Sequence, residues 1–193
     1  LAMACTWGWT AEASASHFRH GTINWRTPDP DNFPLRVEFT VITSWRSASI
    51  GSTNLAFGDG SVNGTLRGTT IGTGVDNNGN PYTTTQYIAT HDYAAEGEYT
   101  AFFDSCCRVA GLQNGANADF RVEATVGLGG GNTAPLATGS TAIVQLERGA
   151  VRTHDFLMFD ADGDPVSCRF ATSAESGLPV GQEVPSVANG GAQ

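Results

Sequence analysis

The chain has 193 residues and carries 19 acidic against 10 basic residues, which gives a net charge of −9. Hydrophobic residues make up 40% of the chain and charged residues only 15%, a balance that excludes an intrinsically disordered protein and provides for a buried core. All ten basic residues are scattered arginines, and no run of about 18 apolar residues occurs, so we expect neither a nucleic-acid partner nor a membrane-spanning helix.

The N-terminal region contains Trp7 and Trp9, which share one face of an extended strand. This geometry suits stacking against a sugar ring, although core packing would use the same two side chains. His17 and His20 follow, and their spacing places them on opposite faces of a strand. We therefore expect the histidines to pack and hydrogen-bond at a strand end rather than to bind a metal ion.

Apolar and polar residues alternate with a period of two along several short segments, which predicts β-strands. Glycine, asparagine, aspartate and proline separate these segments, as turns require. The predicted strands cover residues 35–43, 99–103, 120–126, 142–146, 156–159 and 165–170. Helix patterns are nearly absent. The chain is therefore expected to be all-β, with the architecture of an immunoglobulin-like β-sandwich.

Two short motifs mark the first half of the chain. Residues 57–61 read Phe-Gly-Asp-Gly-Ser, and residues 90–100 contain His91, Tyr93, Gly97 and Tyr99 in an H-x-Y-x-x-x-G-x-Y pattern. Together they resemble the signatures of the PKD repeat, an extracellular immunoglobulin-like sandwich. The resemblance covers residues 36–126 and implies a binding or spacer module without catalysis. We assign residues 1–130 to this module, with an N-terminal extension.

The first module departs from the PKD pattern in two places. Leu55-Ala56 stands where Trp-Asp is usual, and a loop insertion of about residues 62–86 separates the two signatures. The insertion holds a weak candidate cation site at Asp76, Asn78 and Asn80, although a plain glycine and asparagine turn explains the same residues. It also holds Asn63, in the only N-glycosylation sequon, which matters if the chain passes through a eukaryotic secretory pathway.

The four cysteines are Cys5, Cys106, Cys107 and Cys168. Their spacing fits no zinc pattern, so we expect disulfides and an oxidising compartment. We expect the adjacent pair not to bridge internally, which leaves Cys5 joined to one of the two and Cys168 to the other. Four free thiols, or a bridge to a neighbouring subunit, are the alternatives.

The second module, residues 131–193, begins after a glycine run. Its opening Asn132-Thr133-Ala134-Pro135 and its Asp160-Ala161-Asp162-Gly163-Asp164 segment resemble a cadherin-like repeat. The resemblance implies calcium at Asp160, Asp162 and Asp164, and a solvated acidic turn is the alternative. The module is partial, because it offers only about three strands where a sandwich typically has about seven. A loosely held tail is expected from residue 181.

No G-x-S-x-G, H-E-x-x-H or P-loop motif occurs, and we expect no enzymatic activity. The sequence therefore predicts a non-catalytic structural or adhesive protein that is extracellular or on the cell surface. Because the second module is incomplete, we expect self-association by strand addition, as in a subunit of a surface fibre. The alternative function is a calcium-dependent carbohydrate-binding adhesin. The expected partners are further copies of the chain, other surface proteins or glycans.

Overall fold

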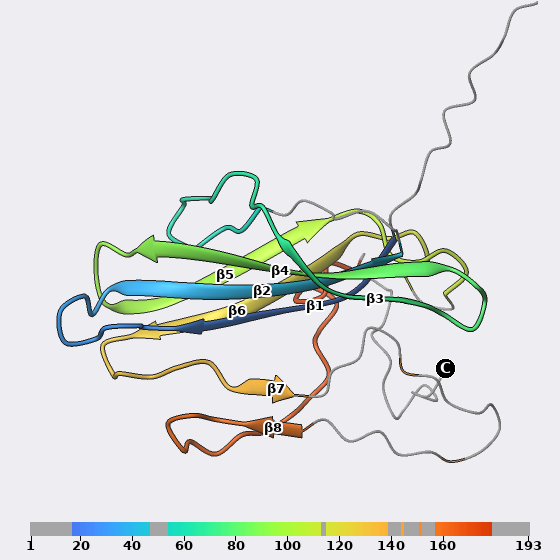
Figure 1. Ribbon diagram of the computed structural model, residues 1–193. Coiled ribbons are helices and arrows are strands. Elements are labelled where there is room, and N and C mark those ends of the chain that lie inside the picture. Colours follow the sequence, from blue (N-terminus) through green and yellow to red (C-terminus); the bar gives the residue numbers. More distant parts are fainter. Residues whose placement is uncertain are drawn as a thin grey trace, which may run out of the picture.

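The computed structural model describes residues 17–46, 54–112, 115–138, 144, 151 and 157–178. These residues form antiparallel β-strands and no helix (Figure 1). The strands are β1 (His17–Arg26), β2 (Arg36–Arg46), β3 (Thr69–Val75), β4 (Pro81–Asp92), β5 (Gly97–Ser105), β6 (Phe120–Leu128), β7 (Leu136–Thr138) and β8 (Leu157–Phe159).

The larger sheet has four strands in the order β1-β2-β4-β3. Strand β2 lies in its middle and shows why the period-two pattern was informative: Val37, Phe39 and Val41 are fully buried, and the residues between them are partly exposed. Each of these side chains contributes about 1.5–3 kcal/mol when it is removed from water. The strand predicted at residues 35–43 is confirmed.

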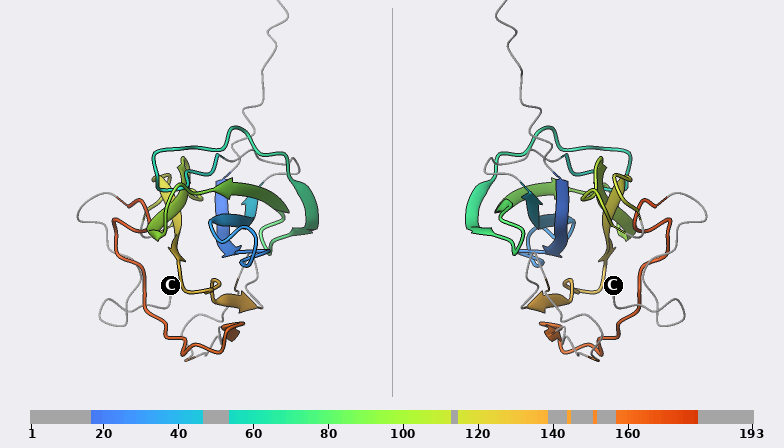
Figure 2. Two further views of the ribbon diagram at one scale, coloured as in Figure 1. Left: turned by 90° about the vertical axis from the view of Figure 1, so that its left-hand side faces the viewer. Right: turned by 90° about the vertical axis from the view of Figure 1, so that its right-hand side faces the viewer.

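Strands β5 and β6 form a second sheet that packs on the larger one, and Figure 2 shows the two layers end-on. The rings of Phe18 on β1 and Phe120 on β6 are stacked, with centroids 3.8 Å apart. The indole Nε1 of Trp25 on β1 donates a hydrogen bond of 2.8 Å to the carbonyl of Thr125 on β6. The all-β, immunoglobulin-like sandwich expected from the sequence is confirmed.

The predicted loop insertion at residues 62–86 is wrong in part, because it contains β3 and the first half of β4. These strands pair with each other across the turn at Asp76–Asn80. Their sequences are rich in threonine and glycine, and Thr83 and Thr85 occupy buried positions. Because these core positions are polar, the alternation of apolar and polar residues that would predict the two strands is absent.

The second half of the described chain is less regular. Strands β7 and β8 form a two-stranded sheet, whereas residues 165–170 form no strand, and Val166 and Phe170 are exposed. That strand prediction is wrong, since none of the strands in the described part of the chain pairs with these residues. Residues 172–178 return to the sandwich, where the backbone N–H of Arg121 donates to the Ser176 carbonyl. The division into modules 1–130 and 131–193 stays a prediction.

Candidate functional site

The Phe-Gly-Asp-Gly-Ser motif forms a tight turn beside β5. Gly58 has a φ of +89°, and a Cβ built there would lie 2.5 Å from the Thr100 carbonyl oxygen, so only glycine fits. Asp59 then accepts hydrogen bonds from the backbone N–H and the hydroxyl of Ser61, and its second oxygen lies 2.7 Å from His91 Nε2. The Ser61 hydrogen bonds, with a contribution from His91, lower the pKa of Asp59 to about 2.

The second motif closes over the first. The His91 ring stacks on Phe57 with centroids 4.1 Å apart, and Tyr93 meets the His91 ring edge-on at 4.5 Å. The buried Tyr93 hydroxyl donates to the Phe57 carbonyl at 2.8 Å, and burial raises the pKa of that hydroxyl. Ser61 and Asp59 both approach the same His91 nitrogen, so the three do not form a nucleophilic relay. The cluster fastens the turn to the end of β4.

The candidate cation site at Asp76, Asn78 and Asn80 is a hydrogen-bonded turn. One Asp76 oxygen accepts the backbone N–H groups of Asn78 and Asn80, and the other lies 2.7 Å from Arg19 Nη2. The Arg19 guanidinium, with the turn N–H groups, holds the pKa of Asp76 well below its usual range. Arg19 and Asp76 are both nearly buried, so arginine supplies the positive charge at this loop.

The Asp160–Asp164 loop is also organised by hydrogen bonds. Asp160 accepts from the backbone N–H groups of Asp162 and Asp164. Asp162 accepts from both the N–H and the hydroxyl of Thr133 at 2.7 and 2.8 Å, which joins the loop to the opening of the predicted second module. Across the described residues, no three His, Cys, Asp or Glu side chains gather as a metal ion would require. Calcium binding here stays a prediction.

The cysteine pairing differs from the expectation. Cys106 and Cys107 are joined to each other, and this vicinal disulfide closes across a cis peptide that brings the two Cα atoms to 3.1 Å. This arrangement differs from the expected joining of Cys5 and Cys168 to the adjacent pair, and the disulfide connectivity of the chain stays a prediction. Cys168 is an exposed free thiol. Cys5 lies outside the described residues.

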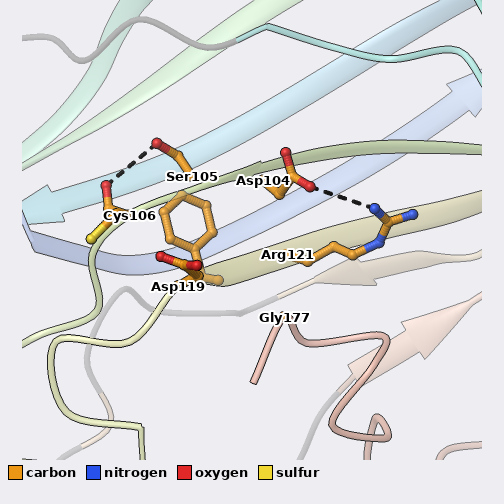
Figure 3. Close-up of a pocket in the computed structure, with 7 residues that line it drawn as sticks. Asp104, Ser105, Cys106, Asp119, Arg121 and Gly177 are labelled. Atoms are coloured by element: carbon orange, nitrogen blue, oxygen red, sulfur yellow. Dashed lines mark hydrogen bonds and ion pairs between the residues drawn. The ribbon is translucent and has the colours of Figure 1, made fainter. Parts of the chain in front are cut away.

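A shallow cavity of about 360 Å³ lies where β5 ends and β6 begins, next to the vicinal disulfide (Figure 3). The residues that line it are Asp104, Ser105, Cys106, Asp119, Phe120, Arg121 and Gly177. Opposite charges lie on its wall, because Arg121 Nη1 is 3.6 Å from Asp104 Oδ2. The cavity offers carboxylates, a hydroxyl and a guanidinium, which suits a small ligand rich in hydroxyl groups.

Sequence reasoning did not find this cavity. Of the residues that line the cavity, the sequence analysis named only Cys106 as a site residue, and it named that residue as a disulfide cysteine. The signal present was a set of charged residues, Asp104, Asp119 and Arg121, at the facing ends of two predicted strands. The strand pairing that brings Asp104 opposite Arg121 could not be read from the pattern alone.

The remaining predicted residues are distributed as follows. Trp7 and Trp9 lie outside the described residues, so the sugar-stacking platform stays a prediction. Asn63 lies in the loop after the first motif, and its backbone N–H donates to the Leu55 carbonyl at 2.8 Å. Its glycosylation also stays a prediction. Within the described part of the chain, no helix is long and apolar enough to cross a membrane.

Comparison with known proteins identifies relatives of the sandwich. The chain is 34% identical over 127 residues to integrin beta-like protein C of Dictyostelium discoideum, which covers 58% of this chain and 6% of that protein. It is 27% identical over 132 residues to integrin beta-like protein B of the same organism, which covers 63% of this chain and 7% of that protein. The chain thus spans a small fraction of these relatives. No solved structure matches it significantly.

A family model also matches, and its match spans the described sandwich. It is the model of the N-terminal region of integrin beta-like proteins A–E, and it matches residues 19–129, from β1 through β6. This family, rather than the PKD repeat specifically, is what the comparison supports. The chain belongs to the family of integrin beta-like protein A–E N-terminal domains.

Proposed function

We propose that this chain is a non-catalytic adhesive domain that works outside the cell. The observation that carries the proposal is the family match over residues 19–129, since integrins are cell-adhesion receptors and the relatives are named for their likeness to the integrin beta chain. The vicinal disulfide supports an oxidising location. The PKD-like signatures support the role of a rigid module in a larger surface protein.

The architecture suits that role. The turn at Asp59 is tied to β4 through His91, and the turn at Asp76 is tied to β1 through Arg19. Both turns are thereby fixed to strands far away in the sequence, which keeps the surface loops in defined positions. A fixed loop loses little conformational entropy when it binds a partner.

The adhesive role is tested with beads that carry the full chain. Coated beads are allowed to settle on cells of the source organism, and the force needed to detach them is compared with that for beads carrying the heat-denatured chain. We expect the folded chain to raise the fraction of beads that resist detachment several-fold. Equal retention of the two bead types would refute an adhesive role.

A second candidate function is carbohydrate binding, and the cavity at the end of β5 favours it. Asp104, Ser105 and Arg121 supply polar groups for sugar hydroxyls. A panel of immobilised glycans, probed with the native chain and with Asp104→Asn, tests this candidate. Binding that is lost in the variant supports the cavity, and binding that is lost only with a chelator supports a calcium site at Asp160–Asp164. If the native chain binds none of the immobilised glycans, carbohydrate binding is refuted.

Self-association into a fibre is a further part of the proposal. Leu157 and Phe159 of β8 are 65% and 49% exposed, so the small β7–β8 sheet presents apolar side chains that a second copy would cover. Negative-stain microscopy of the purified chain, with and without a chelator, tests this. Fibres support the proposal, and their loss in chelator adds calcium to it. Dispersed particles in both conditions would refute the fibre.

A further inference from the structure

Every β-sandwich must deal with the edges of its sheets, because an open edge presents unpaired N–H and C=O groups to other chains. The edge of β1 is covered at both ends. Near its start, the Phe18 N–H donates to the Cys107 carbonyl at 2.9 Å, and near its end the Ala134 N–H donates to the Trp25 carbonyl at 3.0 Å. Two separate segments of the chain therefore protect this edge.

The smaller sheet is protected in the same way. Ala56 and Phe102 exchange two backbone hydrogen bonds of 2.9 Å along the outer edge of β5. On the outer edge of β6, the Arg121 N–H donates to the Ser176 carbonyl at 3.0 Å. Irregular segments thus take the place that another strand would otherwise fill.

Strand β3 is different. It pairs with β4 on one side, and among the described residues no hydrogen bond reaches its other side. Figure 2 shows β3 at the side of the sheet farthest from β5 and β6. Its side chains are correspondingly bare, since Ile71 is 51% and Val75 is 65% exposed.

The sequence of β3 carries few of the features that protect natural edges. Thr69–Val75 contains no charged residue and no proline, which are two of the usual means of blocking strand addition, and a bulge is a third. A bulge lies at Ile71, between the paired residues Thr70 and Gly72, and it leaves Gly72–Val75 in regular register with β4. This stretch is an uncharged, exposed template for another strand.

We propose that β3 is a self-association edge, at which the β3 strand of a second copy adds antiparallel to the first. The charge distribution favours a second copy. Thr69–Val75 carries no charged residue, so a second β3 strand meets no like charge along this edge, whereas the remaining surface of a chain with a net charge of −9 repels another copy.

The contact uses the same surface on both copies, so it closes as a symmetric dimer. This inference deepens the proposed adhesive function, because it names the partner of one surface.

Sedimentation equilibrium of the full chain, from about 1 µM to about 1 mM, tests the dimer. The variant Thr73→Lys places a charge at the centre of the regular stretch, and Thr90→Lys is the matched control at an exposed position of β4 beyond the β3 pairing. We expect the native chain and Thr90→Lys to dimerise equally, and Thr73→Lys to associate at least tenfold more weakly. A native chain that stays monomeric, or a Thr73→Lys variant that dimerises like the native chain, would overturn the proposal.

Hydrogen exchange of the native chain gives a second measurement that needs no variant. Amide exchange in Thr69–Val75 should slow as the concentration rises through the dimerisation range, while exchange in β5 stays constant. Concentration-independent exchange in β3 would also overturn the proposal. If the native chain is monomeric but beads that carry it are still retained on cells, the dimer is refuted and the proposed adhesive function is not. If Thr73→Lys abolishes that retention although the native chain is monomeric, the edge binds a different protein and the second copy is refuted.

Discussion

The stacked aromatic side chains between the two sheets allow a sharp test of the fold. Phe120 is fully buried; its ring stacks on Phe18 and lies edge-on to Trp45 and Phe103 at 5.5 and 6.0 Å. Phe120→Ala removes the side chain that joins β6 to the larger sheet and leaves a cavity. Buried Phe→Ala changes cost about 3–5 kcal/mol, so we expect a loss of about 4 kcal/mol in the free energy of unfolding.

Urea denaturation followed by tryptophan fluorescence measures this loss. With an m-value of about 2 kcal/mol/M, the midpoint should fall by about 2 M. Phe170→Ala is the matched control, because Phe170 is 57% exposed and its truncation should change stability by less than about 0.5 kcal/mol. A Phe120→Ala variant that loses no more stability than Phe170→Ala would refute the placement of β6 against β1.

Three further predictions follow from the turns and the cysteines. The pKa of Asp59 is lowered to about 2. Its contribution to stability is therefore present above the unfolded pKa of about 3.9 and is lost as the pH falls toward 2. The variant Asp59→Asn should weaken the pH dependence of the free energy of unfolding between pH 4 and pH 2, and an unchanged pH dependence would contradict this. Arg19→Met removes the positive charge beside the Asp76 carboxylate and leaves its hydrogen bonds from Asn78 and Asn80 in place, so the urea midpoint should fall, whereas an unchanged midpoint would show that the ion pair contributes little. Iodoacetamide without reductant should label Cys168 but not the two cysteines of the vicinal disulfide; peptide mass mapping checks this, and labelling of all three would disprove the pairing.

The strands that the sequence predicted best are those whose inward residues are all apolar. Val37, Phe39 and Val41 on β2 alternate with polar residues, and the same pattern located β5 and β6. Strands β3 and β4 were not among the predicted strands, because threonine fills inward positions of β4 such as Thr83 and Thr85 and β3 consists largely of threonine and glycine. Threonine occurs at both buried and exposed positions, so the alternation of apolar and polar residues that predicts a strand is lost from the sequence.

The candidate sites were harder to predict because they depend on pairing between distant segments. The residues around Asp76 in the sequence suggest a cation ligand. The carboxylate is instead paired with Arg19, which lies on β1, far from Asp76 in the sequence. In the same way, Asp104 and Arg121 share a cavity wall only because β5 and β6 pair in one particular register. Local spacing specifies turns well, whereas the charge that faces a turn is decided by the fold.

The arrangement of the two signatures bears on where binding specificity lies. Both carboxylate oxygens of Asp59 accept hydrogen bonds, the Tyr93 hydroxyl donates to the Phe57 carbonyl, and the His91 ring is stacked on Phe57. These polar groups are engaged within the protein, so a ligand that used them would have to replace hydrogen bonds that the fold already makes. The signatures therefore hold the scaffold together, and we propose that recognition uses groups that these contacts leave free. The cavity beside the vicinal disulfide and the uncovered edge of β3 are two such surfaces, and they lie on different strands of the sandwich. A change at one should leave the other intact, so that ligand binding and self-association can be removed separately.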